Sequence, residues 1–200
     1  MSRKTVDGIV IWAVSLACLL PMLWLVWRGY QGDLGANPIE KIIRNLGVWG
    51  LRLLIVGLTV TPLARILKQP RLIRVRRPIG LIAFGYIVLH LTTYIGVDQY
   101  FDWAAIWKDI VKRPFITIGM AAFVLLIPLA ATSFNAAIRR LGPLVWRKLH
   151  RLIYLIVPLG VVHYYLLVKA DHRPPVIYGV IVLLLLGYRL LPSVSRSKAA

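Results

Sequence analysis

The chain has 200 residues, of which 59% are hydrophobic and 16% are charged, and its formal net charge is +18 at pH 7. A soluble domain of this length cannot bury so much apolar surface, which excludes that class and indicates a helical membrane bundle. The basic residues cluster at the ends of apolar stretches, so the charge indicates membrane topology and excludes nucleic-acid binding. The single cysteine, Cys18, excludes a disulfide framework and a cysteine metal cluster.

Six apolar stretches each approach the roughly 20 residues that a helix needs to cross the hydrocarbon core. They cover 8–28, 47–66, 79–97, 115–133, 149–168 and 175–191. The first is longer than a signal-peptide core, and we expect it to be retained. No repeat or polar segment separates them. We therefore predict an all-α membrane protein, a six-transmembrane-helix bundle in which residues 1–200 form a single domain.

Two connecting segments are predicted to form short interfacial helices. In the first, Asn37 can cap a helix, Pro38 suits its first turn and Glu40 completes a capping-box spacing. Ile39, Ile42, Ile43 and Leu46 then share one face. In the second, apolar residues recur at helical spacing over 103–111. Both helices should lie in the outer interface, either as loop anchors or as a platform for an extracytoplasmic partner.

The distribution of charge predicts the orientation of the bundle. The amino terminus, 62–78, 134–151 and the carboxyl tail carry 16 basic residues and one acid, Asp7. The opposite connections carry 8 basic and six acidic residues. The positive-inside rule places the first set, and both termini, in the cytoplasm. Tryptophans at the outer interface agree with this: Trp24, Trp27, Trp49, Trp103 and Trp107.

Two histidines of parallel spans are predicted to lie at the same depth. His90 is about 12 residues, or ~18 Å, from the cytoplasmic start of the third span, and His163 is about 15 residues, or ~22 Å, into the fifth. Neutral imidazole is a common axial ligand of haem iron. A depth-matched pair could clamp one haem between the two helices, with no open iron position and hence a role in electron transfer. The alternative for either histidine is an interhelical hydrogen bond.

His150 lies near the cytoplasmic end of the fifth span, 13 positions before His163. On an ideal helix this spacing rotates the side chain by about 220°, so the two imidazoles should occupy different faces unless Pro158 kinks the helix. His150 has no second histidine at its depth. It could serve a cytoplasmic-side haem with another sixth ligand, or a quinol site. His172 is given no role.

Three arginines are candidates for cofactor binding. Arg76 and Arg77 stand at the cytoplasmic start of the third span, where they would serve topology and bind lipid phosphate, or instead hold haem propionates or a quinone. Arg52 could snorkel to the outer interface or neutralise propionates of the outer haem. Four glycines permit close approach of helices or of a flat macrocycle: Gly80, Gly85, Gly119 and Gly160.

The sequence contains no phosphate loop, dinucleotide fingerprint or soluble flavin or nicotinamide domain. A haem protein of this kind must take electrons from a lipid-soluble donor or another protein and pass them on.

Several segments together resemble the MsrQ family, formerly YedZ, within the ferric-reductase-like transmembrane group. They are RRPIGLIAFGYIVLH (76–90), KRPFITIG (112–119), LAATS (129–133) and RRLGPLVWRKLHRLIY (139–154) with His163, together with GANP (35–38) and VTPLAR (60–65). The resemblance covers nearly the whole chain, and the set of motifs is specific although each alone would be weak.

The resemblance implies an inner-membrane subunit that binds b-type haem, one or two, with His90, His150 and His163 at the functional histidines of the family. It implies electrons from the quinone pool, or also from a cytoplasmic flavin reductase. Their acceptor would be a periplasmic molybdopterin enzyme, MsrP, which reduces methionine sulfoxide and forms a heterodimer with the membrane subunit. FMN is also attributed to the family, and no residue pattern here places it. The alternatives are a transmembrane reductase of ferric iron or another acceptor, and a haem-free transporter or assembly factor.

Overall fold

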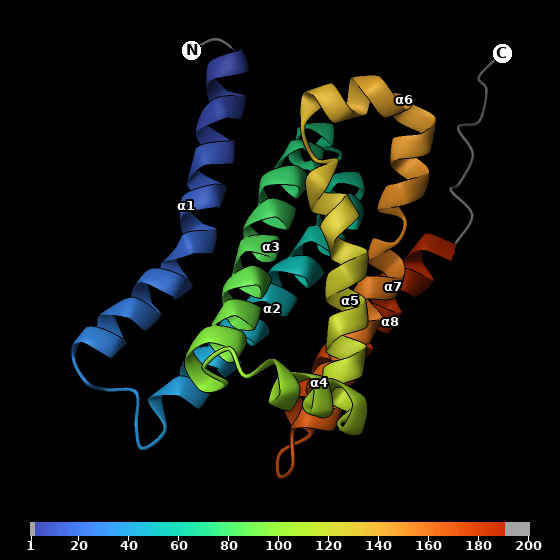
Figure 1. The fold of residues 1–200 in the computed structure, drawn as a ribbon. Helices are drawn as coiled ribbons and strands as arrows, with labels where there is room; N and C mark the ends of the chain where they lie inside the picture. The colour runs from blue at the N-terminus through green and yellow to red at the C-terminus, as the bar shows by residue number, and fades with distance from the viewer. Residues whose placement is uncertain (1–2, 191–200) are drawn as a thin grey trace, which may run out of the picture.

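The computed structural model describes residues 3–190, and the regular structure of these residues is entirely helical. The α-helices follow in the order α1 (Arg3–Tyr30), α2 (Pro38–Ile66), α3 (Arg76–Thr93), α4 (Trp103–Lys112), α5 (Pro114–Ala131), α6 (Asn135–His150), α7 (Ile153–Leu167) and α8 (Arg173–Leu190). A 3₁₀ helix, η1 (Pro70–Val75), leads into α3, and a π-helix, η2 (Tyr94–Asp98), extends it. Figure 1 shows the long helices side by side.

Six stretches of the described chain are long and apolar enough to cross a membrane. They are Thr5–Tyr30, Pro38–Ile66, Pro70–Asp98, Pro114–Ala131, Asn135–Leu167 and Arg173–Leu190. The predicted all-α, six-span architecture is therefore confirmed, although the last residue of the predicted sixth span, 191, lies outside the described residues. The protein is a multi-pass membrane protein.

The ends of the bundle differ in charge. The start of α1, η1 and α6 lie at one end, and α4 and the loop between α7 and α8 lie at the other (Figure 1). We call the first the basic end, because η1, α6 and the adjoining residues carry Arg65, Lys68, Arg71, Arg74, Arg76, Arg77, Arg139, Arg140, Arg147, Lys148 and Arg151. The second is the α4 end. Of the terminal cations in the predicted charge count, Arg196 and Lys198 lie outside the described residues.

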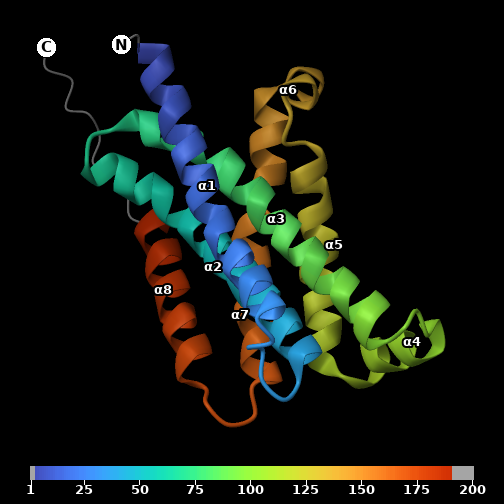
Figure 2. The ribbon, with the colours of Figure 1, turned by 90° about the vertical axis from the view of Figure 1, so that its left-hand side faces the viewer.

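α2 is the central helix of the bundle. Half of its most apolar window is buried (50%), compared with at most 17% for any other span. It packs along α3, while α5 packs along α7 and α7 along α8. Figure 2 shows α2 enclosed between α1, α3 and α8. The other spans expose Leu, Val, Ile and Trp side chains outward, as a lipid-facing surface requires.

α1 is attached to the bundle through a hydroxyl group of α3. Pro21 has no N–H and disturbs the helical ladder of α1. Tyr86, only 2% exposed, inserts its hydroxyl there: it accepts from Met22 N (2.9 Å) and donates to Cys18 O (3.0 Å). One buried phenol thus satisfies a donor and an acceptor that an uninterrupted helix would pair with each other.

The predicted interfacial helix at 38–46 is not a separate element. Asn37 caps it as expected, since its Oδ1 accepts from Glu40 N at 3.2 Å, and Pro38 opens it. However, the helix continues without a break to Ile66 as α2. No proline follows Leu46 before Pro62, and Leu46 and Gly50 are both buried, so packing carries the helix through in spite of Gly47. The second predicted interfacial helix is confirmed as α4, capped by Asp102 through Ala105 N (3.0 Å).

The segment 134–151, predicted to be a connection, is instead largely helical. α6 runs through it, bent at Gly142, whose φ of 75° and ψ of 155° favour glycine, directly before Pro143. A turn at 151–152 then separates α6 from α7. His150 therefore ends α6 and does not belong to the helix that carries His163, so the predicted 220° rotation on one continuous helix does not apply.

Candidate functional site

The structure brings His90 of α3 and His163 of α7 together. Their ring centroids lie 6.3 Å apart and their planes meet at 79°. α2 packs on both α3 and α7, and α5 also packs on both α3 and α7. These two helices therefore fix how α3 and α7 lie relative to each other. The equal depth predicted for these two side chains is confirmed. Four helices thus converge on one pair of imidazoles near the α4 end.

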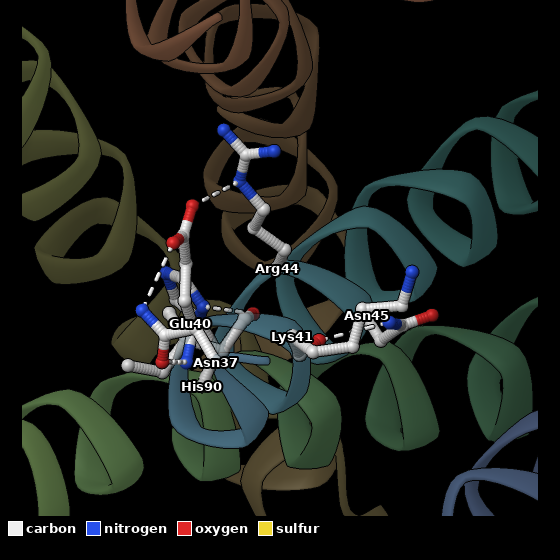
Figure 3. A network of polar contacts seen from close by, with 7 residues as sticks. Asn37, Glu40, Lys41, Arg44, Asn45 and His90 are labelled. Atoms are coloured by element: carbon white, nitrogen blue, oxygen red, sulfur yellow. Dashed lines mark hydrogen bonds and ion pairs between the residues drawn. The ribbon is translucent and has the colours of Figure 1, made fainter. Parts of the chain in front are cut away.

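Each imidazole of the pair is held by one backbone carbonyl. His90 Nδ1 lies 2.9 Å from Ile43 O of α2, and His163 Nδ1 lies 2.6 Å from Phe115 O of α5. Figure 3 shows His90 beside the first turns of α2, with the contacts of Asn37, Glu40 and Arg44. A carbonyl oxygen only accepts, so both Nδ1 atoms carry the proton and both Nε2 atoms carry the lone pair.

Both Nε2 atoms are left without a protein partner. Among residues 3–190, no hydrogen bond is made by Nε2 of His90 or of His163. A neutral imidazole that donates from one nitrogen to a carbonyl and keeps a lone pair on the other has the form of a metal ligand. A purely structural role, in which each histidine forms an interhelical hydrogen bond, accounts for only one nitrogen of each ring.

The separation of the rings fits one metal ion between them. A ligating histidine nitrogen lies about 2 Å from its metal, and half an imidazole adds about 1 Å, so two trans ligands place their ring centroids roughly 6 Å apart. The rings can rotate about the metal–nitrogen axis, so a plane angle of 79° is compatible with this. Among the described residues, no group of three or more His, Cys, Asp or Glu side chains could hold a metal ion. The donor set therefore suits a metal that brings equatorial ligands of its own, as haem does.

His150 occupies a different site at the basic end. Its Nδ1 lies 3.0 Å from Trp146 O, one turn earlier in the same helix, and its ring stacks on Trp146 at a centroid distance of 3.9 Å. Its Nε2 lies 3.5 Å from Ser133 Oγ, which donates instead to Leu129 O at 2.6 Å. His150 therefore has the Ser133 hydroxyl and the Leu129 backbone as further neighbours, and the structure does not bring another histidine to it. His172 contacts Tyr165 near the α4 end, with ring centroids 4.8 Å apart.

The three candidate arginines lie apart from one another. Arg52 of α2 donates from Nε to Tyr178 OH (2.6 Å), and this hydrogen bond joins α2 to α8. The guanidinium group also stacks over the Trp49 ring, 4.6 Å from its centroid. Arg77 donates to Asn135 Oδ1 (2.6 Å) and so joins α3 to α6. Arg76 is half-buried and interacts electrostatically with His150. Within residues 3–190 none of the three has a carboxylate partner, so each keeps its charge for an anion.

Two glycines pack directly against the imidazoles of the pair. A Cβ on Gly119 would lie 2.7 Å from His163 Nδ1, and one on Gly47 would lie 3.0 Å from His90 Nδ1. Sequence reasoning named Gly119 for close approach but missed Gly47, because nothing in the spacing says which face of α2 meets α3. Gly80 and Gly85 were named as well, yet a Cβ on either would meet nothing within 4 Å. The expectation of close helix approach at those two positions is wrong.

The chain is similar to known proteins over most of its length. The family model described as "Ferric reductase like transmembrane component" matches residues 13–161. The protein-methionine-sulfoxide reductase heme-binding subunit MsrQ of Caulobacter vibrioides is 63% identical over 187 residues, which cover 94% of this chain and 89% of the relative. The subunit of the same name from Rhodospirillum rubrum is 53% identical, with 94% and 90% covered. That of Polaromonas naphthalenivorans is 48% identical, with 88% and 82% covered.

The family match spans well over half of the chain, and these relatives are similar over almost their full length. The chain therefore belongs to the MsrQ family, within the ferric-reductase-like transmembrane group.

Proposed function

We propose that this chain is the haem-binding electron-transfer subunit of a methionine sulfoxide reductase system, and that His90 and His163 are the axial ligands of a haem b. The observation that carries the proposal is the pair of imidazoles with centroids 6.3 Å apart, each with Nδ1 donated to a carbonyl and Nε2 free. The names of the relatives, which are heme-binding subunits, support it. On this proposal the whole chain, 1–200, forms one ferric-reductase-like transmembrane haem-binding domain.

The residues of the pair do three things for a bound haem b. When bound, haem b supplies a one-electron ferric–ferrous couple, and two imidazole ligands leave no open iron position for oxygen chemistry. His90 and His163 would hold the group between α3 and α7. The carbonyls of Ile43 and Phe115 hold the Nδ1–H tautomer and raise the basicity of the ligands. The surrounding helices leave both imidazoles only partly exposed.

The basic end is the proposed cytoplasmic side, where electrons arrive from the quinone pool. The excess of positive charge there supports this orientation in a bacterial inner membrane, with both termini cytoplasmic. His150, with Ser133 and Arg76 nearby, would serve a second haem or a quinol headgroup. Arg76 and Arg77 would hold propionates or a quinone there, or lipid phosphates, while Arg52 would meet propionates of the outer haem. A cytoplasmic flavin reductase, and FMN, belong to the same proposal without an assigned residue.

The α4 end is the proposed docking face for a periplasmic molybdopterin reductase of the MsrP type, with which the chain would form a heterodimer. α4 buries Ile106 and exposes Trp103 (65%) and Trp107 (68%). The His90–His163 pair lies near this end, so an electron leaving the pair would have a short path to a partner seated on α4.

A reduced-minus-oxidised absorption spectrum of the purified protein tests the proposal. We expect a b-type band in the native chain that is lost in His90→Ala and in His163→Ala. His172→Ala is the matched control, since His172 lies in the loop before α8 and its ring contacts Tyr165. A native chain without the band would contradict the proposal and favour a haem-free transporter or assembly factor. A band of native intensity in both variants would contradict the assignment of the pair as haem ligands.

A transmembrane reductase of ferric iron or another acceptor is the second candidate, because the family model that matches is that of ferric reductases. The two redox functions differ in the acceptor. The reduced protein should be reoxidised rapidly by a purified periplasmic methionine sulfoxide reductase and slowly by ferric chelates. The reverse order of rates would support the second candidate.

A further inference from the structure

Both imidazoles of the pair rest on the same local structure in two unrelated helices. His90 donates to the carbonyl of Ile43 and packs on Gly47, four residues later in α2. His163 donates to the carbonyl of Phe115 and packs on Gly119, four residues later in α5. Each imidazole is therefore held by the same two groups, a backbone carbonyl at position i and a glycine at position i+4. We call these two groups the cradle of the histidine. His150 lacks this arrangement, since its acceptor is in its own helix.

Helix geometry explains why the glycine stands at that position. In an α-helix the carbonyl of residue i accepts from the N–H of residue i+4, and the side chains of these two residues lie on the same face. The oxygen keeps a second lone pair, but a side chain at i+4 covers the approach to it. Glycine leaves the oxygen open to a donor from another helix. Glycine also weakens a helix interior, so its presence here is not explained by helix formation.

At Gly119 the contacts leave no room for a methyl group, and at Gly47 the imidazole would have to give by a few tenths of an ångström. A Cβ on Gly119 would lie 2.7 Å from Nδ1 and 2.9 Å from Cε1 of His163. A Cβ on Gly47 would lie 3.0 Å and 3.1 Å from the same atoms of His90. In both cases the ring would have to move away from its carbonyl, and the shorter contact and shorter hydrogen bond are both at His163.

We propose that Gly47 and Gly119 are positioning residues, which open a helix carbonyl to the Nδ1–H of each axial histidine and so fix the plane, tautomer and basicity of the ligand. The inference rests on the proposed function, in which the pair holds a haem. A ligand imidazole whose N–H is donated to a carbonyl is a stronger electron donor and favours the ferric state. Loss of either cradle should therefore raise the reduction potential, with the larger shift at Gly119.

Gly47→Ala and Gly119→Ala in the full-length haem-loaded protein test the inference, with Gly8→Ala in α1 and Gly187→Ala in α8 as matched controls, where a Cβ would meet nothing within 4 Å. Redox titration should give a higher midpoint potential in the first two variants, and the electron paramagnetic resonance g-values of the ferric state should shift with the ring plane. Both controls should match the native chain. Unchanged g-values and potential in Gly119→Ala, or equal shifts in the controls, would overturn the inference.

A second measurement does not depend on haem uptake. If the added methyl group collides with the imidazole, Gly119→Ala should lower the thermal unfolding midpoint of the detergent-solubilised chain when His163 is present, but not in a His163→Ala background. Equal losses in both backgrounds would show that the glycine serves the helix and not the ring, and would overturn the inference. If the native chain has no b-type band, the proposed function fails. If the band depends on both histidines but the potential and the g-values do not change in the glycine variants, only this inference fails.

Discussion

The histidines near the α4 end and the histidine at the basic end are oriented by different kinds of contact. His90 and His163 donate to carbonyls that lie 47 and 48 positions away in the chain, whereas His150 donates to Trp146, four positions away. The orientation of the pair therefore depends on how α2, α3, α5 and α7 pack together. The orientation of His150 depends mainly on the local geometry of α6. Substitutions that change one kind of contact should leave the other intact, and this can be tested from the largest expected effect to the smallest.

Gly142→Ala should have the largest effect and should act at the basic end alone. The backbone of Gly142, at φ 75° and ψ 155°, lies in a region that is strained for a residue with a Cβ, at a cost of about 1–3 kcal/mol. α6 should lose its bend, and His150 should be displaced. The thermal unfolding midpoint should fall, while the b-type band of the pair keeps its position. Gly187→Ala in α8 is the control, since a Cβ there meets nothing within 4 Å; a shifted band in Gly142→Ala alone would show that the two ends are coupled.

Tyr86→Phe should destabilise the bundle without changing either histidine site. The substitution leaves Met22 N and Cys18 O without their shared partner, which costs about 1–3 kcal/mol for buried groups. Chemical or thermal unfolding in detergent measures the loss. Tyr94→Phe is the matched comparison: its hydroxyl donates to Asp109 Oδ2 (3.1 Å), but Asp109 keeps Arg113 as a second partner (3.0 Å), so the loss should be smaller. The opposite order would mean that the α1 contact contributes little.

Trp146→Leu and Phe115→Leu test whether a neighbouring residue orients its histidine through its side chain or through its backbone carbonyl. Trp146 stacks on His150, and such aromatic pairs contribute about 0.5–1.5 kcal/mol, so its loss should alter the basic end. Phe115 supports His163 through its carbonyl, which the substitution preserves. The g-values and the potential of the pair should therefore stay native in Phe115→Leu. A shift as large as that of Gly119→Ala would show that the Phe115 ring, 6.2 Å from His163, orients the ligand.

Trp107→Glu should have the smallest effect on stability and a selective effect on function. Trp107 is 68% exposed, and substitutions at such positions usually change the free energy of unfolding by less than about 0.5 kcal/mol. If α4 docks the periplasmic reductase, electron delivery to that partner should weaken while the haem spectrum is unchanged. Trp103→Glu should weaken electron delivery in the same way, whereas Trp107→Phe should deliver electrons to the partner at the native rate. A lost haem spectrum in Trp107→Glu would contradict the docking role.

Much of the architecture followed from the order of residues alone. Six apolar stretches predict six spans because no other structure satisfies the backbone in hydrocarbon, and the clustered arginines and lysines predict which ends share a side. The depth of His90 and His163 also follows from counting, since the rise per residue of a helix is constant. The break at Gly142 and the helical nature of α6 did not follow, because a basic, weakly apolar segment is as typical of a loop as of an amphipathic helix.

Only the tertiary structure decided which face of each helix is turned toward which neighbour. Counting along the chain places an imidazole at a depth, but it does not say whether the ring faces lipid, another helix or a gap. Packing of α2 on α3 brought Gly47 under His90, and packing of α5 on α7 brought Gly119 under His163. The physical reason is that the rotation of each helix about its axis is set by the fit of side chains between neighbouring helices. The role of a glycine can therefore be recognised only when the atom that packs against it is known.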